Sequence, residues 1–168
     1  ASRDPRCKTV VDLVPDKWRR PGLFPAGRLD KDTEGLLIIT NDGDFAHHML
    51  SPKKHVFKRY EAVISGTVGV PEIQRFQEGI VLSDGTKCLP AQLQVMERGE
   101  TERVQVEICE GKFHQIKRMF HTISCDVLQL KRLSIGALEL DRALEPGMCR
   151  EISEEERNLV FLRAFSTK

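Results

Sequence analysis

The feature that most constrains the fold is a series of short segments with strand periodicity, joined by tight turns. Residues 60–66 (YEAVISG) alternate apolar and polar side chains, and residues 91–109 contain two more alternating segments around a glycine-bearing turn. Residues 80–90 carry an Asp-Gly turn between apolar positions, which predicts a hairpin. Residues 126–140 return to a strand pattern. Because hairpins join antiparallel neighbours, we expect a largely antiparallel sheet.

Helical patterns are fewer and lie between these strands. Asp44 is placed to cap a short helix, and Ser153 with Glu156 forms a capping box at the start of the last one. Pro71 in the first turn and Gly79 at the end delimit another helix. The predicted helical segments are residues 44–50, 70–80, 112–124 and 153–165. The expected fold class is therefore α+β, with a mixed, largely antiparallel β-sheet flanked by helices.

The start of the chain is less regular. The first two dozen residues are rich in proline, which predicts irregular or extended chain. Residues 36–40 (LLIIT) form a continuous apolar run that ends at Asn-Asp-Gly, which predicts one buried strand followed by a turn. A hydrophobic content of 40% in 168 residues is enough for one domain with its own core.

Composition argues against several classes of protein. No apolar run is long enough to cross a bilayer, and the polar first ten residues lack a signal-peptide pattern. The five cysteines are scattered without a C-x-x-C pair, so neither a zinc site nor a disulfide framework is indicated. Reduced thiols are typical of cytosolic proteins, so we expect a cytoplasmic location and no membrane partner.

Positive charge is clustered, although the net charge is only +1. Acidic residues gather elsewhere, notably at residues 150–157 (REISEEER). Segregation of this kind permits a basic face that binds a polyanion. The clustered cations are Lys53, Lys54, Lys58 and Arg59, then Lys112, Lys117 and Arg118, and finally Lys131 and Arg132.

Asp30 opens the spacing Asp-x-Asp-x-Glu-Gly, which is similar to the first half of a calcium loop. A calcium loop requires a glutamate at its twelfth position, where this chain has Asn41, and loop backbone where residues 36–40 predict a strand. A phosphate-binding loop is also excluded, because G-x-x-x-x-G-K is absent. For Asp32 we expect a turn or capping role, and for Asp30 that role and a chemical one both remain open.

The wider context of Asp30 is similar to a known family. Residues 27–62 contain G-R-L-D-x-x-T-x-G-L, then T-x-D-G, S-P and K-x-Y in that order. This ordered set resembles the signature of the RsuA-type ribosomal RNA pseudouridine synthases, and residues 110–120 and 130–136 resemble later motifs of that family. The sequence HQIKRMF is most similar to the small-subunit (16S) enzymes. The resemblance implies the pseudouridine synthase fold, with a central active-site cleft.

The resemblance also implies roles for three side chains. Asp30 corresponds to the catalytic carboxylate of a reaction that detaches uracil from ribose C1′ through N1 and rejoins it through C5. Lys117 corresponds to the cation that keeps this carboxylate ionised in a closed pocket. Tyr60 corresponds to the ring that stacks on the detached uracil. The stoichiometry of an isomerisation requires no cofactor and no metal.

Further basic residues are expected to bind the substrate. By resemblance, Arg28 would occupy the space that a flipped base leaves. Lys58 would support the site or contact phosphate, and Arg118 would point outward toward phosphate or take the place of the active-site lysine. His114 and Gln115 are expected to form a hydrogen-bonded pair at a helix start, and not to act as acid and base. The remaining phosphate contacts are expected from Lys53, Lys54, Lys112, Lys131 and Arg132.

The expected partner is ribosomal RNA, as 16S rRNA or a small-subunit assembly intermediate, bound by a monomer. Family members usually begin with a short strand carrying N-K-P-x-G, often after an S4-type RNA-binding domain, and neither feature is found in this sequence. We therefore expect residues 1–168 to be a catalytic domain without its first strand and without an S4-type domain.

Two alternatives stay open. One is a catalytically silent RNA-binding module that acts in ribosome assembly. The other is a metal-dependent phosphodiesterase using Asp30, Asp32 and Asp42, which would depend on magnesium or manganese. The intact set of Asp30, Tyr60 and Lys117 favours the synthase over the silent module.

Overall fold

The computed structural model describes residues 5–163, whose strands form one six-stranded sheet and one two-stranded sheet. The order in the larger sheet is β2-β7-β4-β6-β5, and β8 pairs with the end of β7. β2 runs parallel to β7, and the other pairs are antiparallel. The predicted α+β fold with a mixed, largely antiparallel sheet is confirmed. The strands of this sheet are β2 (Glu34–Gly35), β4 (Lys58–Ser65), β5 (Gln92–Glu97), β6 (Glu102–Ile108), β7 (Asp126–Ile135) and β8 (Leu138–Glu139).

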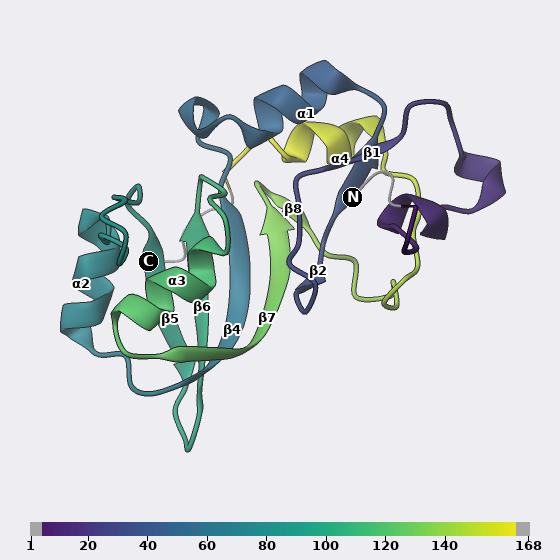
Figure 1. The fold of residues 1–168 in the computed structure, drawn as a ribbon. Coiled ribbons are helices and arrows are strands. Elements are labelled where there is room, and N and C mark those ends of the chain that lie inside the picture. Colours follow the sequence, from purple (N-terminus) through teal and green to yellow (C-terminus); the bar gives the residue numbers. More distant parts are fainter. Residues whose placement is uncertain (1–4, 164–168) are drawn as a thin grey trace.

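The smaller sheet and the helices complete the fold (Figure 1). β1 (Phe24–Ala26) pairs antiparallel with β3 (Ile38–Thr40). α2 and α3 pack against the larger sheet, whereas α1 contacts β1 and α4 contacts β8. The helices are α1 (Gly43–Leu50), α2 (Val70–Glu78), α3 (Gln115–Thr122) and α4 (Glu154–Leu159), with 3₁₀ turns η1 (Val10–Leu13), η2 (Asp16–Trp18) and η3 (Pro52–Lys54). In the described part of the chain, every helix is too short or too polar to cross a bilayer.

The side chains of the described residues form two hydrophobic cores. Phe76 of α2 and Phe120 of α3 pack on the larger sheet in the first core. Met49 of α1 lies in the second core, which also contains residues of β1, β3 and β8. β7 contributes Leu130 to the first core and Ile135 to the second. This strand therefore links the two halves of the molecule.

The strand predicted at residues 36–40 forms over Ile38–Thr40 only, and a further short strand that was not predicted, Glu34–Gly35, precedes it. Glu34–Gly35 pairs with β7, and the chain then leaves this sheet so that Ile38–Thr40 joins β1. Gly35 has φ +118°, and a Cβ there would lie 2.2 Å from the backbone oxygen of Arg132. Glycine allows both the positive φ and the close approach of the two backbones. The chain can therefore cross from one sheet to the other at this point.

Two further predictions are wrong in detail, and a third is confirmed over a shorter range. α1 is capped by Asp42, whose side chain accepts a backbone N–H of the first turn at 3.0 Å, and not by Asp44. The hairpin predicted at residues 80–90 forms with one antiparallel bridge, between Val81 and Lys87, and has Asp84 and Gly85 between the paired residues. α4 ends at Leu159, although the predicted helix extends to residue 165, whose position lies outside the described residues. Such boundaries depend on local hydrogen bonds that a periodic pattern does not specify.

Candidate active site

Asp30 lies in the connection between β1 and β2, where the chain passes from the smaller sheet to the larger one. Gly27, with φ +96°, begins this connection. The backbone N–H of Thr33 donates to the carbonyl oxygen of Asp30 at 2.9 Å and closes a turn. The Asp30 side chain is 27% exposed. The turn therefore presents a partly exposed carboxylate beside α3.

Helix α3 brings Lys117 to this carboxylate. Ile116, Met119 and Phe120 are buried, which leaves Lys117 at the edge of the buried face, as predicted. Its Nζ lies 3.8 Å from Asp30 Oδ2. Two side chains that are far apart in the sequence are thus in contact.

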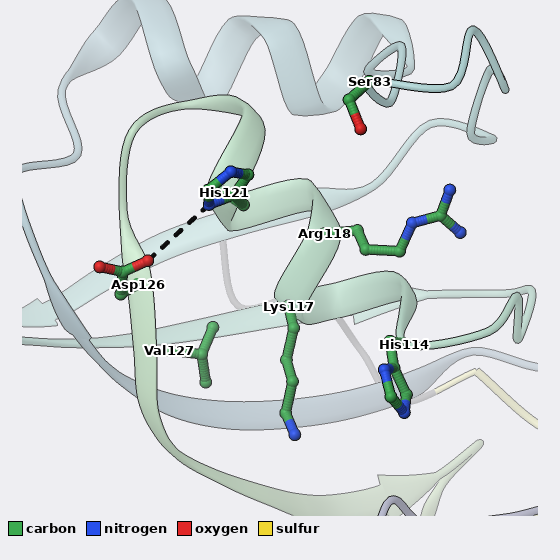
Figure 2. Close-up of a pocket in the computed structure, with 7 residues that line it drawn as sticks. All are labelled: Ser83, His114, Lys117, Arg118, His121, Asp126 and Val127. Carbon is green, nitrogen blue, oxygen red and sulfur yellow. Dashed lines mark ion pairs between the residues drawn. The ribbon is translucent and has the colours of Figure 1, made fainter.

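Arg118 points to a different side of α3 from Lys117 (Figure 2). Its Nη2 donates to Asp84 Oδ2 at 2.6 Å, and its Nη1 donates to the carbonyl oxygen of Phe113 at 3.1 Å. Of the two positions that the sequence left open for Arg118, the outward one is observed. Its guanidinium is already held by a carboxylate of the same chain.

Lys117 has a second and closer acidic partner. Its Nζ lies 2.5 Å from Oδ1 of Asp32, which is on the same turn as Asp30. The hydrogen bond from Lys117 is the largest of the causes that lower the pKa of Asp32. Asp32 lies in a turn, as expected, and also forms an ion pair that was not predicted. One ammonium group is shared between two carboxylates, of which Asp32 is the more exposed.

His114 joins Asp30, Asp32 and Lys117 as the fourth member of this cluster, and the sequence analysis did not place it there. Its Nε2 lies 3.5 Å from Asp30 Oδ1. The neighbouring Gln115 does have the predicted structural role, because its Oε1 accepts the backbone N–H of Lys112 at 2.8 Å. The spacing contained a signal, since His114 precedes Lys117 by three positions and such residues share a helix face. Figure 2 shows both side chains extending to the same side of α3.

Tyr60 is buried, and its partner is Arg132. Tyr60 is 9% exposed, and Arg132 Nη1 lies 3.3 Å from its hydroxyl oxygen. Arg132 Nε donates to the carbonyl oxygen of Leu36 at 2.7 Å. Because Arg132 is only 3% exposed, its predicted phosphate contact at the surface is wrong. The register of β7 places Arg132 opposite Tyr60, and both side chains are buried.

Lys58 also points into the protein. It is 5% exposed, and its Nζ donates to the carbonyl oxygens of Val56 at 3.2 Å and Met49 at 3.5 Å. Burial lowers the pKa of Lys58 to about 8, and the positive charge of Arg132 contributes to the same shift. A phosphate contact by Lys58 is contradicted by this burial, which leaves the other predicted role, support of the site from within.

Three of the predicted substrate-binding cations are exposed on neighbouring segments. Arg28 is in the loop that carries the catalytic candidate, and Lys53 and Lys54 lie in η3, directly after α1. A Cβ at Gly27 would lie 3.2 Å from Leu50 Cδ2, so this loop packs against the end of α1. The three cations therefore lie on two segments in contact with each other.

An open pocket of about 340 Å³ runs along α3 beside the cluster (Figure 2). His114 and Lys117 belong to both the pocket and the cluster, whereas Asp30 does not line the pocket. The cavity thus lies next to the carboxylate and not around it. The lining residues are Ser83, His114, Lys117, Arg118, His121, Asp126 and Val127.

The three aspartates of the proposed metal-dependent phosphodiesterase, Asp30, Asp32 and Asp42, do not lie together in one site. Asp42 caps α1, and its Oδ2 accepts a hydrogen bond from Arg157 Nη2 at 2.5 Å. Among residues 5–163, no three His, Cys, Asp or Glu side chains are grouped so that they could hold a metal ion. Asp42 therefore has a structural role at the start of α1.

Comparisons with known proteins find related sequences and a related fold. The profile of the family described as RNA pseudouridylate synthase matches residues 3–122. An uncharacterized RNA pseudouridine synthase of Bacillus subtilis is 45% identical over 162 residues, 95% of this chain and 67% of the relative. A ribosomal small subunit pseudouridine synthase A of Vibrio cholerae is 45% identical over 150 residues, 89% of this chain and 63% of that protein. A crystal structure described as pseudouridylate synthase matches with a TM-score of 0.82 at 33% identity, over 90% of this chain and 65% of that one.

The chain thus spans about two thirds of the length of these relatives. The profile match covers more than half of the chain, and the similarity to the Bacillus subtilis protein covers nearly all of it. The chain therefore belongs to the RNA pseudouridylate synthase family.

Proposed function

We propose that this protein is a pseudouridine synthase that isomerises a uridine of ribosomal RNA, with Asp30 as its catalytic carboxylate. One observation carries the proposal: in a chain of this family, the Asp30 carboxylate lies 3.8 Å from the Lys117 ammonium and 3.5 Å from the His114 ring. The fold brings Asp30 to His114 and Lys117, which lie at the start of α3 and more than 80 positions later in the sequence.

The chemistry requires a negatively charged oxygen beside the sugar. The bond between uracil N1 and ribose C1′ breaks, and a bond between C5 and C1′ forms. Asp30 would serve as the nucleophile or base, with Lys117 stabilising its negative charge. Its exposed fraction of 27% leaves the carboxylate accessible to a nucleoside drawn out of the RNA.

Tyr60 is proposed as part of the uracil site, with Arg132 as its anchor. Stacking holds a base without a covalent bond, which suits a base that must turn over between bond breakage and bond formation. The contact between Arg132 Nη1 and the tyrosine hydroxyl, at 3.3 Å, limits the motion of the ring. Because Tyr60 is 9% exposed, its ring would present only a small patch to uracil.

Phosphate binding is assigned to Lys53 and Lys54, which are exposed on a segment next to the loop of Arg28. Such contacts supply affinity and orientation but carry no sequence choice. Arg28, also exposed, would occupy the space that the flipped base leaves. Since the Vibrio cholerae relative is named as a small-subunit enzyme, the proposed substrate is 16S rRNA or a small-subunit assembly intermediate. We propose that residues 1–168 act as a monomeric catalytic domain in the cytoplasm.

Two variants of the same loop test the assignment. Asp30→Asn removes the charge and preserves the size of the side chain, so it should abolish pseudouridine formation while RNA affinity stays within a few fold. Asp32→Asn is the matched control, because it makes the same change beside the same lysine and should keep substantial activity. Both are measured by chemical mapping of pseudouridine in ribosomal RNA from cells that lack the protein and carry each variant.

The outcomes separate the alternatives. Turnover retained by Asp30→Asn would reject the catalytic assignment. If the wild-type protein binds ribosomal RNA but restores pseudouridine at no position, the silent RNA-binding module is the better description. The mapping also identifies the uridine that is modified.

A further inference from the structure

Two aromatic rings stack beside the candidate active site, outside both hydrophobic cores. The rings of Phe113 and His114 have centroids 3.8 Å apart and an interplanar angle of 18°. Phe113 is 66% exposed, and neither residue belongs to a core cluster. Burial in a core therefore does not account for an aromatic residue at position 113.

The turn that carries the rings is fixed by hydrogen bonds on both sides of His114. His114 has φ +47°, in the left-handed region that residues with a Cβ rarely adopt. The side chain of Gln115 accepts the backbone N–H of Lys112 at 2.8 Å, and Arg118 Nη1 donates to the carbonyl oxygen of Phe113 at 3.1 Å. An unfavourable backbone conformation persists where surrounding contacts impose it, and such positions are frequent at functional sites. The ring pair is therefore preorganised.

The two stacked rings lie between the solvent and Asp30. His114 lies against one face of Phe113, and its Nε2 is 3.5 Å from Asp30 Oδ1. Lys117 Nζ approaches the same carboxylate at 3.8 Å. A planar group that stacked on the other face of Phe113 would be separated from His114 by the Phe113 ring alone. It would therefore lie close to Asp30.

We propose that the free face of Phe113 binds an unpaired RNA base adjacent to the target uridine, with His114 as a positioning residue beneath it. This inference rests on the proposed function. A uridine that leaves its stack deprives its neighbour of a stacking partner, and an aromatic side chain can replace that partner for any base. The neighbours Lys112, His114 and Arg118 are polar, and Lys112 and Arg118 are ion-paired with Glu110 and Asp84. Such surroundings suit a nucleotide base better than an apolar protein surface.

The test compares variants of Phe113 on a short RNA that contains the target uridine. Loss of stacking should raise KM about tenfold in Phe113→Ala and Phe113→Leu with little change in kcat, whereas Phe113→Trp keeps the wild-type KM. Val70→Ala is the control, because Val70 is an apolar residue of α2 that is 76% exposed. It should behave as wild type.

A second arm identifies the base. The nucleotide 5′ or 3′ to the target uridine is replaced by an abasic nucleotide. If Phe113 stacks on that neighbour, wild type and Phe113→Ala should have equal KM values on one of the two modified RNAs. The proposal would be overturned if Phe113→Ala had the wild-type KM on the natural RNA. It would also be overturned if the ratio of the variant KM to the wild-type KM were the same on all three RNAs.

A binding measurement separates this proposal from the proposed function. If wild type forms no pseudouridine, RNAs with 2-aminopurine at either neighbouring position still report stacking, because stacking quenches their fluorescence. The proposal is supported if wild type and Phe113→Trp quench the 2-aminopurine fluorescence and Phe113→Ala does not. His114→Asn should quench it less than wild type does. Asparagine tolerates the left-handed backbone but removes the supporting ring. Absence of quenching by wild type, or equal quenching by all proteins, would count against the stacking site.

Discussion

Lys117 divides one positive charge between two carboxylates. Its ammonium is 2.5 Å from Asp32 and 3.8 Å from Asp30, yet the Asp32 side chain is 74% exposed and that of Asp30 only 27%. Exposed ion pairs contribute little to stability, because water and salt screen them. The lysine can therefore move toward Asp30 at small cost when a substrate covers the loop.

Lys58 gives the stability of the fold a pH dependence in the alkaline range. Its pKa in the folded protein, about 8, lies below the ordinary value of 10.5, chiefly because the side chain is buried. Between these pH values the unfolded chain binds a proton that the folded chain has lost, so stability rises as the pH rises through this range. The full difference between the two pKa values corresponds to a rise of about 3 kcal/mol in the free energy of unfolding.

Lys58→Met removes this titrating group. We expect the variant to lose most of the rise in unfolding free energy between pH 8 and 10.5. Lys54→Met makes the same substitution at an exposed position of η3 and should keep the wild-type slope. The measurement is urea unfolding at several pH values in this range. Equal slopes for all three proteins would show that Lys58 does not titrate there.

At the scale of elements, β7 joins the parts that the site needs. It pairs with β4 on one side and with β2 on the other, and β2 follows directly from the Asp30 turn. It also carries Arg132, which contacts both Tyr60 and the backbone of Leu36. The parallel β2–β7 pair therefore sets where the Asp30 turn lies relative to Tyr60.

Gly35→Ala should disrupt this pair. A Cβ at position 35 would lie 2.2 Å from the backbone oxygen of Arg132, and φ is +118°. We expect a loss of roughly 3 kcal/mol or more in unfolding stability, together with loss of activity. Gly43→Ala is the matched control, since nothing lies within 4 Å of a Cβ there. Equal urea-unfolding midpoints for the two variants would contradict the close approach of the backbones.

At the scale of the whole molecule, charge is balanced overall but not locally. The net charge is +1, and several predicted RNA-binding cations are buried or ion-paired with carboxylates of the same chain. The predicted binders Lys53 and Lys54, together with Arg28, remain exposed beside the Asp30 loop. RNA affinity should therefore depend on a small number of phosphate contacts on this side.

The double variant Lys53→Ala with Lys54→Ala tests that view. Each phosphate contact to a single strand contributes about 0.7 to the slope of log K against log salt, so the slope should fall by about 1.4. Lys17→Ala in η2, whose ammonium lies 4.2 Å from the centre of the Trp18 ring, should leave the slope unchanged. The slopes come from RNA-binding titrations at several salt concentrations. No difference between the variants would place the phosphate contacts elsewhere.

Features that depend on near neighbours were predictable. The alternating burial of β4, the buried face of α3 and the Ser153 capping box follow from side chains a few positions apart, and all three are observed. The resemblance to a family also paired Asp30 with Lys117, and the structure places these side chains in contact. Their catalytic roles remain predictions.

The sequence by itself determined the α+β class, most of the strands and helices, and the residues whose chemistry suits the reaction. Only the tertiary structure decided that Lys117 also binds Asp32, that His114 reaches Asp30, and that Lys58 and Arg132 are buried. It also shortened the strand expected at residues 36–40 to Ile38–Thr40 and placed Glu34–Gly35 in the other sheet. The physical reason is that periodicity specifies which side of an element is buried, whereas partners distant in the chain depend on how the elements pack.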